Sequence, residues 1–304
     1  MNRYLKGCLF VILSATMFGC ASLFVKNIYL GGGNAISIVF YRNFLPLPFL
    51  YLILKWKKIS LKVSRTEFAK LFACSAIGAV LTPIVLYSSF HYINSGMATT
   101  LHFIYPVFVF LFCWLFFREK IDLLHGACLV LCMLGILLFY TPGQQANLMG
   151  IFLACTSGIS YAAYIVYLAK SGMGKLYPFK YSFYIASICS VLIFFYSMLT
   201  QSFVYRMTNT AWLWMVVFAM LLTLVAVILF QSGTNLVGAQ HTAILSTFEP
   251  LASIVVGVLA FHERFTARTL LGTIMILVSV VMLTLFNKAK KKTGETEKKI
   301  IAAS

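Results

Sequence analysis

Long apolar segments recur along the whole chain and are separated by short breaks that contain charged or turn-forming residues. The segment from Thr242 to Phe261 is typical, because a single charged residue, Glu249, interrupts it. A helix of this length rises about 30 Å, which matches the hydrocarbon core of a bilayer. The chain is 61% hydrophobic and only 10% charged, which is far too apolar for a soluble domain. The sequence therefore predicts an all-α membrane protein that crosses the bilayer several times.

Ten transmembrane helices are predicted from the alternation of apolar runs and polar breaks. The first run follows Arg3 and Lys6 and has no small-residue cleavage signal, so we interpret it as a retained span and not as a signal peptide. The spans are predicted at residues 7–26, 34–54, 68–91, 95–117, 122–140, 148–169, 179–199, 211–235, 241–261 and 266–287.

Basic residues are unequally divided between the two faces that ten spans create. With the N-terminus in the cytoplasm, 19 Lys and Arg residues fall on the cytoplasmic side, 4 fall outside, and Arg42 remains inside the second span. Loops rich in Lys and Arg stay on the cytoplasmic side of a membrane. Both termini are therefore predicted to be cytoplasmic, in a bacterial inner membrane whose lipids surround the spans. These loop clusters also account for the net charge of +17, so no nucleic-acid partner is predicted.

The chain contains an internal duplication, and its strongest match covers the fourth and ninth predicted spans. A shift of 144 positions relates the two copies. Self-similarity at a fixed shift indicates a repeated structural unit. The shift places Leu101 on Leu245, Pro106 on Pro250, Leu115 on Leu259, Phe117 on Phe261 and Glu119 on Glu263.

The duplication divides the chain into two related halves, residues 1–142 and 143–287, followed by a basic tail at 288–304. Each half holds five predicted spans, and because five is odd, the second half enters the membrane from the opposite side. The predicted fold is therefore two inverted five-helix repeats, with the working site between them near the middle of the bilayer. The tail consists mostly of lysine, glutamate and small residues and is predicted to be disordered.

Two charged residues are predicted inside the membrane and are the first candidates for substrate binding. Glu249 lies about 10 Å from the cytoplasmic end of its span, where a charge costs about 3 kcal/mol or more. A functional carboxylate is the preferred interpretation, and a structural acid bonded to a neighbouring helix is the alternative. Arg42 needs a carboxylate, backbone carbonyls or water as a partner, and a permanent structural ion pair is as well supported as substrate binding. We expect the two residues to bind opposite ends of a zwitterion, or to pair when the site is empty.

Uncharged polar residues of the spans are the second set of candidates. For each of them a hydrogen bond between helices is the structural alternative to substrate binding, and for His102 a role as a proton carrier is a further one. Pro106 and Pro250 occupy the same depth in the two halves, so they are predicted to be hinges that line a cavity. The uncharged substrate-binding candidates are His102, Tyr105, Gln231 and Asn235.

The charged residues near the ends of the spans are given no binding role. Lys26 is interpreted as a side chain that reaches the outer interface. Glu119 and Glu263 stand beside Lys120 and Arg264, and they are predicted to form ion pairs at helix ends.

No cofactor and no metal are predicted. The sequence has no glycine-rich phosphate-binding pattern, which argues against transport driven by ATP. Its eight cysteines all lie in apolar runs, where thiols behave as small hydrophobic groups, so no disulfide framework is expected.

The paired blocks from Pro106 to Glu119 and from Pro250 to Glu263, set in two five-span repeats, resemble the EamA-type members of the drug/metabolite transporter superfamily. The glycine-bearing first span and the positions of Lys26 and Arg42 are also similar. The resemblance covers residues 5–287, and it implies secondary transport of small metabolites. It also implies that spans 1–4 and 6–9 surround a central cavity, with spans 5 and 10 behind it.

The two halves differ in charge where they line this cavity. Ile185 stands in the second half where the first has Arg42, and Tyr105 stands in the first half where the second has Glu249. The expected cavity is therefore asymmetric.

The function that the sequence favours is secondary transport of a small polar or zwitterionic metabolite, such as an amino acid, by alternating access. A coupling proton or an exchanged solute is the expected second partner, and a homodimer is left open. A membrane enzyme that acts on a lipid-linked substrate, or a scaffold that transports nothing, is the alternative. An enzyme is not favoured, because Glu249 is the single deep acid and no metal-ligand spacing is present. The identity of the substrate and the direction of transport do not follow from the sequence.

Overall fold

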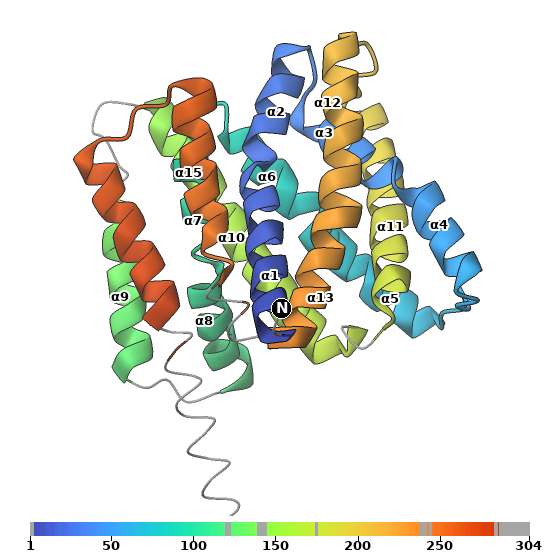
Figure 1. The fold of residues 1–304 in the computed structure, drawn as a ribbon, viewed down its shortest axis with the longest axis horizontal. Coiled ribbons are helices and arrows are strands. Elements are labelled where there is room, and N and C mark those ends of the chain that lie inside the picture. Colours follow the sequence, from blue (N-terminus) through green and yellow to red (C-terminus); the bar gives the residue numbers. More distant parts are fainter. Residues whose placement is uncertain are drawn as a thin grey trace, which may run out of the picture.

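The structure is a computed structural model that describes residues 3–118, 123–138, 145–173, 176–237, 242, 245–282 and 285. These residues form helices and connecting turns, without a strand, and the helices stand side by side in one bundle (Figure 1). Seven helical segments of this part are long and apolar enough to cross a membrane. Three further apolar helices are shorter: Gly126–Leu137, Phe248–Phe261 and Ala267–Met282. The protein is therefore a multi-pass membrane protein, and the number of ten spans stays a prediction.

Local signals in the sequence mark the starts of several helices in both halves of the chain. Asn34 caps a helix by accepting a hydrogen bond from the Ser37 backbone N–H at 2.8 Å. Ser64 and Glu67 form a capping box. The helices of the first half are α1 (Arg3–Gly19), α2 (Ala21–Leu30), α3 (Ala35–Phe44), α4 (Leu47–Trp56), α5 (Arg65–Cys74), α6 (Thr82–Ser89), α7 (Ser95–His102), α8 (Tyr105–Phe117) and α9 (Leu123–Leu137). Those of the second half are α10 (Gln145–Ser171), α11 (Pro178–Leu199), α12 (Asn209–Met220), α13 (Val227–Val237), α15 (Phe248–Phe261) and the helix Ala267–Met282.

The fourth predicted span of each half is broken just before its proline. In the first half α7 ends at His102 and α8 begins at Tyr105, so that Pro106 lies in the first turn of α8. In the second half α15 begins at Phe248, and Pro250 lies in its first turn. Proline is tolerated there because a first-turn N–H has no partner inside the helix. Both breaks therefore present the N-terminus of a helix within the bundle.

The third span of each half is also irregular, and at matching places. A π-helical segment, Ser75–Leu81, joins α5 to α6, and a second one, Leu221–Ala226, joins α12 to α13. A π-helical turn widens the backbone and is often found near functional sites. The third and fourth spans of the two halves thus share their irregular features.

The two halves are interlocked through their first helices. α1 packs against α13 and α15 of the second half, while α10 packs against α6, α7 and α8 of the first half. Small residues allow close approach, because a methyl group on Gly7 would come within 2.6 Å of Val237. The Ser14 hydroxyl of α1 also donates to the Ala226 carbonyl, at the end of the π-helical segment before α13, at 2.8 Å. The interior between α1 and α10 is therefore built from both halves.

α9 and the helix Ala267–Met282 lie side by side at one edge of the bundle (Figure 1). The Ser279 hydroxyl donates to the Cys128 carbonyl at 2.7 Å, and Gly135 lies against Ile276. This peripheral place is the one that the family resemblance implies for spans 5 and 10.

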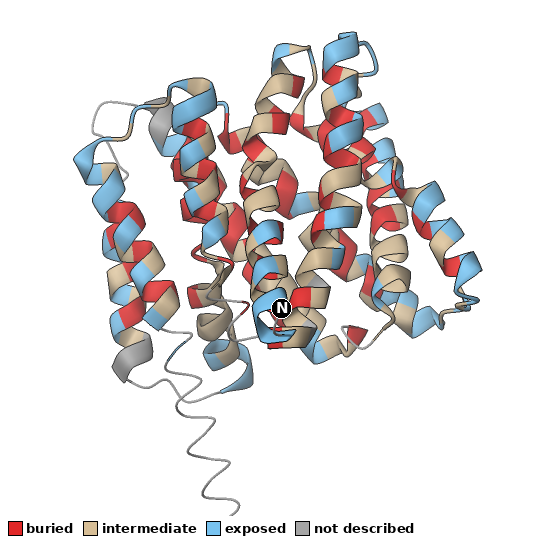
Figure 2. Ribbon diagram, viewed as in Figure 1, coloured by how far each residue is buried: buried red, intermediate tan, exposed pale blue. Residues whose placement is uncertain are grey.

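Large apolar side chains cover much of the outer surface. Leu30, Leu199 and Leu259 are among them, with exposed fractions of 83%, 85% and 73%. Figure 2 shows exposed and half-buried residues along the outer helices, with buried residues concentrated on the central ones. In water such a surface would aggregate, so it fits contact with lipid chains.

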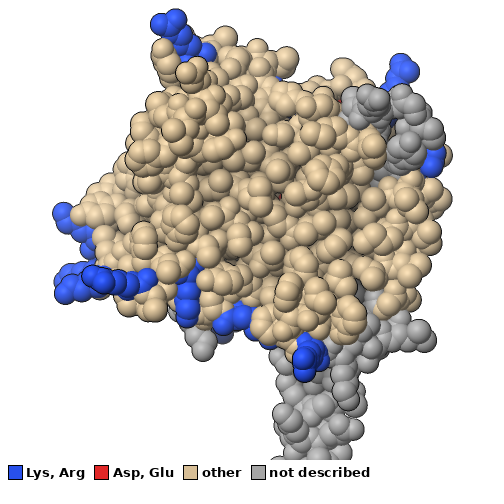
Figure 3. Space-filling model, turned by 180° about the vertical axis from the view of Figure 1, so that it is seen from behind, with Lys and Arg blue, Asp and Glu red and all other residues tan. Residues whose placement is uncertain are grey.

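Basic residues gather toward the ends of the helices. In Figure 3 the Lys and Arg side chains of this face lie mostly along the lower part, with a few at the top, and the middle of the face shows no blue side chain. An exposed group on α4 and in the turn after it, Lys55, Lys57, Lys58 and Lys62, contributes to this basic end. The pattern is that of a protein with an apolar belt and one basic face.

Candidate functional site

Arg42 lies between the two halves of the bundle. It is carried by α3, and its guanidinium donates a hydrogen bond to the Tyr87 hydroxyl of α6. The carbon of the guanidinium lies 5.5 Å from the centre of the Phe218 ring on α12. Tyr87 is buried, with an exposed fraction of 2%. Arg42 is thus oriented by one helix from each half.

Glu249 lies in the first turn of α15, where the positive end of the helix dipole favours a carboxylate. It interacts electrostatically with Arg42, yet within the described part of the chain no ion pair joins the two. Nor does a side chain of the described residues hydrogen-bond to the Glu249 carboxylate. The Arg42–Glu249 pair that was the alternative for an empty site is therefore not formed in this structure, and both groups are left for another partner.

Tyrosines form the wall beside Glu249. Tyr105, the first residue of α8, packs edge-on against Tyr161 of α10 with ring centres 4.8 Å apart. Tyr161 stacks on Tyr164 at 5.6 Å, and the hydroxyl of Tyr164 shares a hydrogen bond of 2.9 Å with that of Tyr181. Tyr105 and Tyr161 are both within electrostatic reach of Glu249. Helices of both halves thus supply aromatic and hydroxyl groups to one region.

His102 makes the interhelical bond that was its structural alternative. Its exposed fraction is 7%, and its Nδ1 lies 2.9 Å from the Ser157 hydroxyl of α10. The ring also lies 5.3 Å from that of Tyr161. His102 therefore supports the tyrosine wall, and a direct role in binding stays a prediction.

The other predicted site residues are placed in part. Gln231 and Asn235 belong to α13, but their side chains lie outside the described residues. Pro106 and Pro250 stand at the two helix starts next to Tyr105 and Glu249. Their positions agree with a bent point, and movement about them stays a prediction.

Tyr87, Tyr161 and Phe218 were not among the predicted site residues. The repeat carried a signal for Tyr87, because the shift of 144 places it on the candidate Gln231. Tyr161 and Phe218 had no such signal, since neither aligns with a candidate residue.

Glu263 has a different partner from the one expected from its neighbours in sequence. An end-of-helix pair with Arg264 was predicted, but the structure pairs Glu263 with Lys26 of α2. Lys26, which was given no binding role, thus has a defined partner, and its place at the outer interface stays a prediction. The reason is packing: α2 lies against α15, so Lys26 can meet the residue that follows α15.

Metal binding has no visible support in the part of the chain that the structure describes. Among those residues, no group of three or more His, Cys, Asp and Glu side chains lies close enough to hold an ion.

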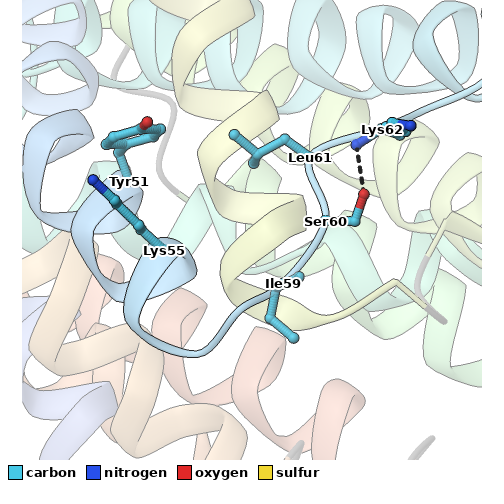
Figure 4. A pocket seen from close by; sticks show the side chains of 6 residues that line it. All are labelled: Tyr51, Lys55, Ile59, Ser60, Leu61 and Lys62. Carbon is cyan, nitrogen blue, oxygen red and sulfur yellow. Dashed lines mark hydrogen bonds between the residues drawn. The ribbon is translucent and has the colours of Figure 1, made fainter.

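A surface depression lies apart from the Arg42 and Glu249 region, between the end of α4 and the turn before α5 (Figure 4). The Lys62 backbone N–H donates to the Ser60 hydroxyl at 3.2 Å within it. It opens at the basic end of the bundle. The residues that line it are Tyr51, Lys55, Ile59, Ser60, Leu61 and Lys62.

Comparisons with known proteins show the family of the chain. Residues 5–141 and 148–285 each match the EamA-like transporter family. An uncharacterized transporter of Synechocystis sp. is 26% identical over 98% of this chain and 98% of its own. The uncharacterized inner membrane transporter YicL of Salmonella typhimurium is 25% identical over 97% of this chain and 100% of its own.

More distant similarities extend to animals and to a solved structure. Solute carrier family 35 member G1 of Mus musculus is 25% identical over 59% of this chain and 51% of its own. A crystal structure of a protein described without a function shares 11% identity and superposes with a TM-score of 0.64, over 92% of this chain and 98% of its own. At that identity the superposition shows a common fold alone.

Proposed function

Because this chain belongs to the EamA-like transporter family, we propose that it is a secondary transporter of a small polar or zwitterionic metabolite that works by alternating access. The family and the transporter names of the relatives support transport. The residues around Arg42 and Glu249 support the substrate class.

The observation that carries the substrate class is a pair of opposite charges inside the bundle that do not neutralise each other. Arg42 is oriented by Tyr87 and Phe218, and no described residue pairs with the Glu249 carboxylate. An amino acid would bring an ammonium group to Glu249 and a carboxylate to Arg42, which binds carboxylates with two parallel hydrogen bonds.

Alternating access is supported by the architecture. Each half contributes a fourth span that is broken before its proline and a first helix that packs on the other half. We propose that the halves are inverted repeats of five spans each, residues 1–142 and 143–287, that rock about a site between them. Pro106 and Pro250 are the proposed hinges, and a proton or an exchanged solute is the proposed coupling partner.

The proposal is tested with purified protein in lipid vesicles loaded with one unlabelled solute and given the same solute in labelled form outside. Saturable exchange is expected for one or more neutral amino acids and not for vesicles without protein. Parallel panels contain nucleosides, phosphorylated sugars and apolar drugs. Saturable exchange confined to those panels would contradict the zwitterionic class, and conversion of a lipid-linked substrate without exchange would favour an enzyme.

We propose a bacterial inner membrane, where its name places the Salmonella relative, and both termini on the cytoplasmic side. A reporter that is active only outside the cytoplasm is expected to work when fused after Gln144 and to be silent after Asn287. The reason is that the topology with both termini cytoplasmic keeps the excess of basic residues on the cytoplasmic side. A silent first fusion or an active second one would overturn this topology.

A further inference from the structure

An ion pair joins the two halves near the end of the bundle drawn uppermost in Figure 1. Lys26 of α2 donates to the carboxylate of Glu263, which follows α15, and their side chains are 20% and 5% exposed. The same carboxylate accepts from the backbone N–H of Ser95 at 3.0 and 3.1 Å and from its hydroxyl at 2.9 Å. Three segments, from both halves of the chain, therefore meet at one buried carboxylate.

The chain turns back at the end of α15, so that Glu263 packs against the last turns of this helix. His262 adopts the left-handed conformation, with φ 52° and ψ 33°, and the Glu263 N–H donates to the Gly257 carbonyl at 3.0 Å. A methyl group on Gly257 would overlap the Glu263 carboxylate. The Lys26 ammonium lies 4.6 Å from the centre of the Phe261 ring. A left-handed non-glycine residue costs about 1 kcal/mol and persists where its surroundings hold it in place, which often marks a functional position.

The internal repeat contains a second version of the lysine–aromatic part of this contact. The shift of 144 that relates Phe117 to Phe261 also relates Lys26 to Lys170. The Lys170 ammonium lies 4.2 Å from the centre of the Phe117 ring. Arg118, which the shift relates to His262, ends α8 in the same left-handed conformation, with φ 54° and ψ 31°.

The two contacts are exchanged between the halves. In the first, a lysine of the first half meets an aromatic ring of the second half; in the second, a lysine of the second half meets an aromatic ring of the first. The C-terminal ends of α8 and α10 lie at the lower end of the bundle in Figure 1, opposite to Lys26. Glu119, which the repeat relates to Glu263, lies outside the described residues. A rocking motion that separates the halves at one end therefore separates one contact and leaves the other closed.

We propose that the two contacts are the gates of the transport cycle. The Lys26–Glu263 contact holds the outer end closed, and the Lys170–Phe117 contact holds the cytoplasmic end closed. The inference rests on the proposed alternating access, and both contacts are formed in this structure.

A buried ion pair has suitable energetics for such a gate. The attraction between the two charges is largely offset by the loss of their hydration, so the pair adds little net stability over two hydrated partners. When the outer end opens, water reaches both Lys26 and Glu263 together, and neither is left as an unpaired buried charge. The ion pair therefore defines one closed arrangement of the two halves, and its small net stability allows the outer end to open.

The test follows a reporter cysteine below the outer gate in protein whose eight native cysteines have been replaced. Thr99 is suitable because it is buried on α7, one turn from Ser95, and its hydroxyl lies 3.0 Å from that of Ser253 on α15. A membrane-impermeant thiol reagent is added outside right-side-out vesicles. Lys26→Gln is expected to raise the labelling rate of Thr99→Cys on the order of tenfold, by shifting the population toward the outward-open state.

Matched variants separate a gate from a general loosening of the fold. Arg264→Gln removes an exposed basic residue at the same end and is expected to leave the labelling rate unchanged. Lys26→Arg keeps the charge and is expected to label as slowly as the parent. Ser95→Ala removes one hydrogen bond and keeps the ion pair, so a smaller rise is expected, and it serves if Lys26→Gln does not fold.

The cytoplasmic gate is tested by the reciprocal effect. Lys170→Gln is expected to lower the labelling of Thr99→Cys from outside and to raise that of Val166→Cys, one turn away on α10, in inside-out vesicles. Unchanged labelling in folded Lys26→Gln and Ser95→Ala protein would show that the contacts are permanent structural ties, and the proposal would fall. The labelling measurement needs no substrate, so it is independent of the exchange experiment. Labelling that changes in the Lys26 and Lys170 variants, without exchange of any solute, would overturn the proposed function and support the two gates. Exchange of a solute with unchanged labelling would support the proposed function and overturn the gates.

Discussion

Replacing Glu249 with glutamine is expected to lower substrate flux by about tenfold to a hundredfold, because a hydrogen bond to a charged group contributes about 1.5–3 kcal/mol. Glutamine keeps the volume of the side chain and removes its charge, so the variant tests the charge alone. Glu249 has no ion-pair partner among the described residues, and its neutralisation therefore leaves no charge stranded by a broken pair. Correctly inserted protein with parental flux would exclude Glu249 from substrate binding.

The same experiment on Arg42 distinguishes substrate binding from a structural pair. Arg42→Gln is expected to lose flux as Glu249→Gln does. Arg42→Lys is expected to have a flux between those of the parent and Arg42→Gln, because lysine keeps the charge but cannot stack on Phe218 as a flat guanidinium does. The double variant is expected to be no better than the weaker single variant. Recovery of flux in the double variant would show instead that the two residues pair with each other during the cycle. Arg206→Gln, in the exposed turn before α12, is the matched control.

Gly19→Ala is expected to lower both stability and flux, although it adds a single methyl group. That group would overlap the Glu249 carbonyl oxygen and come within 2.7 Å of the Ala252 Cβ, so α1 and α15 must move apart. Overpacking of this kind costs about 1–3 kcal/mol, and here it displaces the turn that carries Glu249. The measurement is the thermal unfolding midpoint in detergent together with exchange in vesicles.

Gly126→Ala in α9 is the matched control for this substitution, since a methyl group there meets no atom within 4 Å. It is expected to leave both the unfolding midpoint and the flux unchanged. A Gly19→Ala protein with parental values would show that α1 and α15 are not packed as the structure has them.

The repeated unit was predictable because its signals are the local composition and spacing of residues. Apolar runs of membrane length and the matched Pro106 and Pro250 are visible without knowledge of any contact. The structure places a helix break just before each of these prolines, where a missing N–H is tolerated. The two π-helical segments were not predictable, since no composition signal distinguishes them from the helices they join.

For the site, the sequence alone singled out the residues whose presence in a membrane needs an explanation. Arg42 and Glu249 are conspicuous because a charge in an apolar segment is costly wherever the segment packs. Their arrangement relative to each other did not follow from the sequence. The spacing of residues could not distinguish an ion pair between them from two groups that are free to bind a substrate.

Tertiary structure alone decided which side chains meet. Lys26 pairs with Glu263, 237 positions later, although Arg264 is the neighbour of Glu263 in sequence, and Arg42 bonds to Tyr87 while no ion pair joins it to Glu249. Composition and periodicity report how each segment is solvated, which is a local property. The choice of partner depends on which helices of the two halves lie against each other, and that is decided by packing across the whole bundle.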